Sequence, residues 1–308
     1  MHPTHRLHLA HQSLRGLALG DAFGDSFFGD EDAVLRAIAA RRVPAATRWE
    51  FTDDTVMAIA VVDVLARYGR IEPDALARRF AENYHLDPRR GYGATAHRVL
   101  REIGEGRPWR EVSAAVFDGQ GSMGNGAAMR AAPIGAYFHD DAARLIEQAT
   151  LSAEVTHLNA EGVAGAVAVA LAAGLAVRLG QAGEVLRGEE FIDGVYQQLP
   201  GGTDTKAKIG KARSLPGSYR VATAAAVLGN GSRLLAQDTV PFALWVIAHR
   251  LDNFAAALWT AVAALGDRDT IGAIVGSVVS LRADAATVPA DWQQAVESVD
   301  ESSFWGRV

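Results

Sequence analysis

The chain has 308 residues, of which 49% are hydrophobic and 21% are charged, a composition typical of a globular protein with a substantial core. Its net charge of −6 disfavours nucleic-acid binding as the main activity, because such proteins carry a basic surface. The lack of cysteine excludes disulfides, thiolate nucleophiles and cysteine-ligated zinc. It also suits a reducing compartment, and residues 1–13 lack the apolar core of a signal peptide, so we expect a cytoplasmic protein.

Apolar residues recur at three- and four-residue spacing along most of the chain, as they do in amphipathic helices. The stretches with this pattern are 7–19, 55–67, 93–103, 141–151, 160–178, 239–249, 254–264 and 271–281. Strict alternation is scarce, so the sequence predicts an all-α fold, a compact single domain of many helices over residues 1–308.

Two segments need separate interpretation. The longest apolar run, 163–177, is too short to span a bilayer comfortably, so we expect a buried, closely packed helix and no membrane association. Segment 199–219 contains Gly-Gly, two prolines and four basic residues, which predicts a long exposed, flexible loop. Such a loop is either a lid over a site or a mobile insertion.

A polar cluster stands directly before the apolar stretch 55–67: Thr52, Asp53, Asp54 and Thr55. One interpretation is helix capping, because Thr and Asp side chains accept hydrogen bonds from free backbone N–H groups and acids suit the positive end of the helix dipole. A single such residue is enough for that role. The surplus of carboxylates leaves a second interpretation open, in which they hold a ligand.

A similar cluster of Asp and Thr residues occurs far along the chain, where Asp267, Asp269 and Thr270 precede the apolar stretch 271–281. Distant helices commonly meet at one site in all-α domains. Four carboxylates in a small volume would repel one another and take up protons, whereas divalent cations would resolve the conflict. Oxygen ligands favour hard ions such as Mg²⁺ and Mn²⁺, so the pattern predicts a two-metal site that orients a substrate and activates a water.

Two further stretches are less specific. Residues 121–138 combine a Gly-rich turn with a helix start, which is usually only a turn but can also cradle a phosphate or a sugar edge. There we expect Arg130 on the helix as a salt-bridge partner. In 150–165 we expect Thr156 to cap the following helix, with Asn159 or Glu161 folding back, and His157 to be a hydrogen-bonded structural residue.

Six stretches, taken together and in order, carry a resemblance to a known family: 16–25, 51–58, 90–100, 122–135, 155–166 and 266–279. They resemble the ADP-ribosylglycohydrolase family over nearly the whole chain. The resemblance implies a compact all-α fold and a binuclear Mg²⁺ or Mn²⁺ site. It also implies hydrolysis of the bond between ADP-ribose and an acceptor, which is a protein, a nucleic acid or a small molecule.

The same resemblance assigns roles to individual residues. Asp53 or Asp269 would guide the proton of the attacking water. The implied metal ligands are Thr52, Asp53, Asp54, Asp267, Asp269 and Thr270. The implied substrate-binding residues are Tyr92, Gly93, Ser122, Met123, Gly124, Asn125, Gly126 and His157.

Three positions depart from the family pattern. Phe28 stands where many members have a glutamate, and Asp25 and Asp30 are the nearby carboxylates that could replace it. Arg268 stands between the second pair of aspartates instead of Thr or Ser, and Leu265 replaces a leading glycine. These departures keep an alternative open: a catalytically weak relative that binds ADP-ribose or a related nucleotide, or a structural protein.

Overall fold

The computed structural model describes residues 2–44 and 48–306, and within those ranges every regular element is a helix. The first half of the described chain contains α1 (Pro3–Asp25), α2 (Glu31–Ala39), α3 (Asp53–Tyr68), α4 (Pro73–Leu86), α5 (Ala94–Gly104), α6 (Trp109–Ala114), the 3₁₀ turn η1 (Asn125–Ala127), α7 (Ala132–Tyr137) and α8 (Ala142–Glu154). The second half contains α9 (Ala160–Ala182), α10 (Gly188–Tyr196), α11 (Asp204–Arg213), α12 (Val221–Leu228), α13 (Ala236–Arg250), α14 (Phe254–Val262), α15 (Arg268–Val279), the 3₁₀ turn η2 (Ala285–Thr287) and α16 (Ala290–Ala295).

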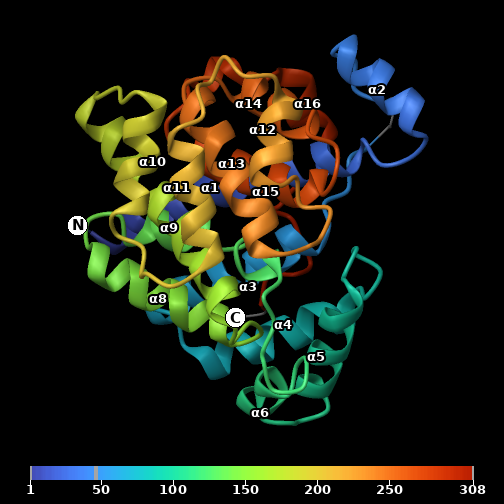
Figure 1. Cartoon of the computed structure of the whole chain (residues 1–308). Coiled ribbons are helices and arrows are strands. Elements are labelled where there is room, and N and C mark those ends of the chain that lie inside the picture. The colour runs from blue at the N-terminus through green and yellow to red at the C-terminus, as the bar shows by residue number, and fades with distance from the viewer. Residues whose placement is uncertain (1, 45–47, 307–308) are drawn as a thin grey trace.

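The predicted all-α class is therefore confirmed, and each of the eight predicted helical stretches falls on one helix, although α1 extends well beyond 7–19 at both ends. Most helices form one packed body, from which α2 projects (Figure 1). The long helix α9 runs through this body. It is long and apolar enough to cross a membrane by length and composition, but 83% of its most apolar window is buried inside the protein, as the sequence predicted for 163–177.

The prediction of a long loop over 199–219 was wrong in part, because helix α11 occupies the middle of the segment. The side chain of Thr203 accepts a hydrogen bond from the backbone N–H of Lys206, and so caps this helix. The carboxylate of Glu161, on α9, accepts the N–H groups of Asp204 and Thr205 at 2.7 and 2.8 Å. The glycines and prolines of the segment only flank the helix, and capping from a distant residue is not visible in local sequence.

The most extensive helix contact is between α1 and α15, which meet along glycines spaced by four residues. A Cβ atom built at Gly20 would lie 2.0 Å from the carbonyl oxygen of Gly272, and one at Gly16 would lie 2.5 Å from that of Gly276. Only glycine allows backbones to approach this closely. The contact continues to Gly24, whose Cβ would meet the backbone of Arg268 at 2.1 Å. The packing of α1 therefore places the start of α15, which carries the second aspartate cluster.

Candidate metal centre and substrate cleft

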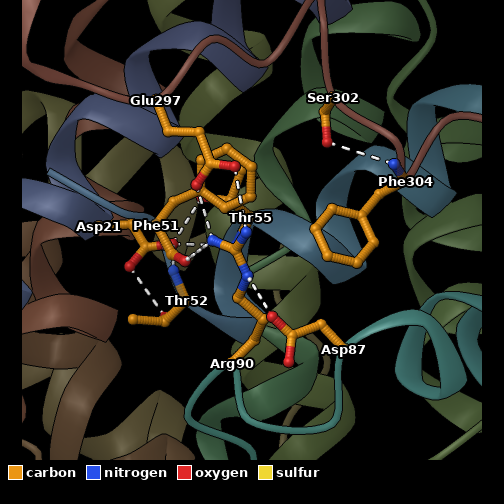
Figure 2. A network of polar contacts seen from close by, with 9 residues as sticks. All are labelled: Asp21, Phe51, Thr52, Thr55, Asp87, Arg90, Glu297, Ser302 and Phe304. Carbon is orange, nitrogen blue, oxygen red and sulfur yellow. Dashed lines mark hydrogen bonds and ion pairs between the residues drawn. The ribbon is translucent and has the colours of Figure 1, made fainter. Parts of the chain in front are cut away.

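The first polar cluster is organised by Asp21, a fully buried residue of α1 that sequence reasoning missed. Its carboxylate accepts the backbone N–H groups of Thr52 and Thr55 at 2.9 and 3.1 Å, and both threonine hydroxyls at 2.8 and 2.5 Å. Thr52 is the N-cap of α3 and makes no side-chain capping bond of its own. Asp21 thus caps α3 from another helix (Figure 2). The side chains of Asp53 and Asp54 are therefore not needed to cap α3.

A second anchor holds the chain just before the cluster. Arg90 donates to the carbonyl oxygen of Phe51 at 2.9 Å and to both carboxylate oxygens of Glu297 at 2.7 and 3.1 Å. Its guanidinium also lies over the Phe51 ring, 5.0 Å from the centroid. Figure 2 shows Arg90 at the centre of this network, with Asp87 on its other side. Residues 51–52 are therefore fixed from two directions, by α1 and by the C-terminal segment.

The two predicted clusters meet at Asp54. Its Oδ2 atom lies 3.2 Å from the hydroxyl oxygen of Thr52 and 3.5 Å from that of Thr270, at the start of α15. The residue is 2% exposed. Its other oxygen, Oδ1, is buried and has no hydrogen-bond partner. A buried carboxylate oxygen without a donor is expensive, so this atom is where a cation would find an open ligand.

The second cluster is also held from outside its own helix. Oδ2 of Asp267 accepts from the side-chain amide of Asn125 at 2.6 Å, and the Asp267 backbone N–H donates to the carbonyl of Asn230 at 3.0 Å. The turn before it runs through Leu265 at φ +59° and Gly266 at φ +70°. A left-handed φ favours glycine, the residue of the family pattern, so Leu265 occupies this position at a cost in strain.

The electrostatics of the cluster favour a positively charged ligand. Burial, followed by the repulsion of Asp21 and Asp269, raises the pKa of Asp53 and of Asp54 well above the usual range. Burial and the neighbouring Asp269 raise the pKa of Asp267 to about 8. Burial raises the pKa of Asp21 to about 7, against the hydrogen bonds that it accepts. Carboxylates with such pKa values are stabilised in their ionised form by a nearby cation.

Among the described residues, no group of three or more His, Cys, Asp or Glu side chains has the spacing of a formed metal site. The donors present nevertheless fit a hard cation, because they are carboxylate and hydroxyl oxygens and include the unpartnered Oδ1 of Asp54. The residues that would hold such an ion are those of the two clusters. Their role as ligands stays a prediction.

Both clusters open on a cleft of about 670 Å³. Of the predicted site residues, twelve line it: Asp53, Asp54, Gly93, Ser122, Met123, Gly124, Asn125, Gly126, His157, Asp267, Asp269 and Thr270. Thr52 lies behind them, bonded to Asp21 and Asp54. Tyr92 does not line the cleft either: it is 5% exposed, and its ring packs edge-on against Tyr84. A larger cavity, of about 1030 Å³, lies by α4, α5 and the C-terminal segment, away from the aspartates.

Arg130 differs from its prediction. It precedes α7 and is fully buried. Its hydrogen-bond acceptors are all uncharged: the oxygens of Gly126, Ser152 and Thr156, at 3.0, 3.1 and 2.8 Å, and the sulfur of Met57 at 3.6 Å. Its guanidinium lies over the Phe80 ring, 4.4 Å from the centroid. Burial lowers the pKa of Arg130 to about 9. The predicted salt bridge was therefore wrong, and Arg130 is a buried cation that borders the cleft.

The capping prediction for 150–165 was also wrong in part. Asn159, and not Thr156, caps α9 by accepting the N–H of Glu161 at 3.0 Å. The hydroxyl of Thr156 instead lies between Arg130 and Nδ1 of His157, at 2.8 and 2.7 Å. The prediction that His157 is hydrogen-bonded was right.

Two of the residues that depart from the family pattern, Phe28 and Arg268, are in contact. The guanidinium of Arg268 lies over the ring of Phe28, 4.6 Å from its centroid, and donates to the carbonyl of Phe27 at 2.8 Å. Phe28 is 46% exposed. Asp30 caps α2 by accepting the N–H of Ala33. Asp25 is exposed at the end of α1, where partial burial and the charge of Asp269 raise its pKa.

This arrangement of helices and clustered aspartates matches one family of proteins. The family model for ADP-ribosylglycohydrolase matches residues 2–304, so the chain belongs to the ADP-ribosylglycohydrolase family, as the resemblance predicted.

Particular relatives extend over most of the chain. The protein is 29% identical to the ADP-ribosylhydrolase ARH3 of Homo sapiens, over 94% of this chain and 90% of the relative. It is 30% identical to the ARH3 of Bos taurus, over 94% of this chain and 88% of the relative. A solved structure, "ADP-ribosylglycohydrolase-related protein complex", superposes with a TM-score of 0.61 at 22% identity, over 96% of this chain and 94% of that chain, which shows a shared fold.

Proposed function

We propose that this protein hydrolyses the glycosidic bond between ADP-ribose and an acceptor, with two divalent cations, Mg²⁺ or Mn²⁺, as cofactors. One observation carries the proposal: two aspartate clusters from distant parts of the chain meet at Asp54, whose Oδ1 atom is buried without a partner in the wall of the cleft. Family membership supports the same activity.

The residues of the cleft have two kinds of role in this proposal, ligand binding and proton transfer. Bound cations would act as Lewis acids and lower the pKa of a bound water. Asp53 and Asp269 line the cleft, and either carboxylate can accept the proton of the attacking water. Asn125 fixes Asp267 through a hydrogen bond of 2.6 Å, and the loop 124–126 borders the same cleft. Positioning and electrostatics would supply most of the acceleration.

The test of this proposal compares matched aspartates. Asp54→Asn should abolish both the thermal stabilisation by Mg²⁺ and the release of free ADP-ribose, and chelation of the wild-type protein by EDTA should do the same. Asp32→Asn, an exposed position on α2, should behave like the wild type. A panel of ADP-ribosylated proteins, nucleic acids and small molecules identifies the acceptor. Full ADP-ribose release in EDTA would overturn the proposal.

A second candidate function rests on Phe28. No carboxylate stands at that position, and the exposed ring stacks against Arg268. A catalytically weak relative would then bind ADP-ribose in the cleft without turning over any acceptor. Calorimetry separates the two: Mg²⁺-dependent binding of ADP-ribose with no release from the whole panel favours the binding protein. Neither binding nor a thermal response to Mg²⁺ would favour a purely structural role.

A further inference from the structure

A chain of three side chains runs from the buried interior to the cleft: Arg130, Thr156 and His157. Nη2 of Arg130 donates to Oγ1 of Thr156 at 2.8 Å, and Oγ1 lies 2.7 Å from Nδ1 of His157. Arg130 is fully buried and Thr156 is 6% exposed, whereas His157 is partly exposed, and all three residues border the cleft. The chain thus joins a fully buried cation to a partly exposed ring in the cleft wall.

Counting donors settles the direction of each bond. A guanidinium has donors only, so Oγ1 of Thr156 must accept from Arg130. The hydroxyl has one hydrogen to donate, and among the described residues its other hydrogen-bond partner is Nδ1 of His157. If Nδ1 carried a proton, the hydroxyl hydrogen would be buried without an acceptor, which is costly. Nδ1 is therefore the acceptor, and the proton of the neutral ring is on Nε2.

The free Nε2–H faces the glycine-rich wall of the cleft. A Cβ atom built at Gly124 would lie 3.2 Å from Nε2, and one built at Gly126 would lie 3.4 Å from it. Only Nδ1 of this ring is bonded among the described residues. Burial and the Arg130 cation also lower the pKa of His157 to about 3, so the ring is neutral at pH 7.

We propose that Arg130 and Thr156 are positioning residues that hold His157 as the Nε2–H tautomer, so that it donates a hydrogen bond to an oxygen atom of the ADP-ribosyl ligand in the cleft. This inference rests on the proposed function for the identity of the ligand. The tautomer itself depends only on the protein. The chain of hydrogen bonds that begins at the Arg130 cation polarises the ring and strengthens its donor, which suits an anionic or strongly polar oxygen.

The first experiment needs no ligand. Long-range ¹H–¹⁵N spectra of histidine-labelled protein at pH 7, with His157 assigned by its loss in His157→Gln, should show Nδ1 unprotonated and Nε2 protonated. Thr156→Val, which keeps the shape but removes the hydroxyl, should give a mixture of tautomers. Thr156→Ser should restore the wild-type spectrum. A protonated Nδ1 in the wild type overturns the proposal, whatever the variants do.

The second experiment measures ADP-ribose affinity by calorimetry with Mg²⁺ present. Loss of one oriented hydrogen bond should weaken binding by Thr156→Val about five- to tenfold, and Thr156→Ser should stay within about twofold of the wild type. Thr260→Val, a remote site where the hydroxyl donates to a carbonyl within α14, controls for the substitution. Unchanged affinity in Thr156→Val overturns the ligand contact. Wild-type protein that binds no ADP-ribose, but shows the Nε2–H tautomer, refutes the proposed function and leaves the positioning intact.

Discussion

Replacing Gly24 with alanine should damage the candidate metal centre without altering any of its ligands. The new Cβ would lie 2.1 Å from the carbonyl oxygen of Arg268 and 2.7 Å from Cα of Asp269. Both are backbone atoms, so no side chain can rotate away. Since non-bonded heavy atoms prefer separations of about 3.5 Å, α1 and the start of α15 must move apart by roughly 1 Å.

Two opposing effects set the change in the free energy of unfolding of Gly24→Ala. Overpacking a close contact costs about 1–3 kcal/mol, and alanine returns up to about 1 kcal/mol of helix propensity. For a chain of 308 residues, a net loss of about 1–2 kcal/mol corresponds to a Tm lower by about 2–3 °C. The contact of 3.5 Å between Thr270 and Asp54 would lengthen by a similar displacement, so the stabilisation by Mg²⁺ should weaken as well.

Differential scanning calorimetry with and without Mg²⁺ measures both effects. The matched control is Gly180→Ala, an exposed helical glycine whose Cβ would meet its nearest atom at 3.4 Å. That variant should match or slightly exceed the wild-type Tm, with an unchanged response to Mg²⁺. If Gly24→Ala behaves in the same way as Gly180→Ala, the helix contact does not position the second aspartate cluster and the reasoning is refuted.

Three further predictions concern single residues. Asp21→Asn turns an amide group toward the N–H donors of α3 and should lower the free energy of unfolding by about 2–3 kcal/mol; urea curves within about 0.5 kcal/mol of the wild type would contradict capping by Asp21. The pKa of His157 is lowered from 6.5 to about 3 in the folded state, so the unfolded state binds the proton first and stability falls as the pH drops below 6.5. Between pH 6.5 and 5.5 this residue should lower the free energy of unfolding by about 1 kcal/mol, a change absent from His157→Gln; urea unfolding in EDTA at pH 6.5 and 5.5 that shows equal pH dependence for both proteins would refute this contribution. Glu161→Gln should weaken the anchoring of α11 and speed hydrogen exchange over 204–213, whereas unchanged protection would show that Thr203 alone suffices.

Much of the fold could be predicted from the local pattern of apolar residues. Eight helices follow from apolar periodicity, and the burial of α9 follows from an Ala-rich stretch with almost no charge. Helix α11 did not follow, because its first N–H groups depend on Glu161, more than forty residues away. Capping by a distant side chain leaves no trace in the segment that it stabilises.

In the candidate site, too, some residues could be predicted from local sequence and others could not. Asp53, Asp54 and Asp269 could be recognised from sequence as a surplus of carboxylates at two helix starts. The importance of Asp21 could have been inferred only from its place as one of two acids in the otherwise apolar, Gly-spaced stretch 16–25. Nothing local distinguishes Tyr92, which is buried behind the cleft, from a residue that lines it.

The sequence by itself determined the helical class, the family and the identity of the two aspartate clusters, because residue type and spacing along one helix are local properties. Only the tertiary structure decided which partners these residues meet. The close packing of Gly20 on Gly272 brings α1 and α15 together, Asp21 caps α3, and Thr156 lies between Arg130 and His157. Each of these contacts joins segments or side chains whose meeting depends on the shape and burial of surfaces that no single stretch of sequence contains.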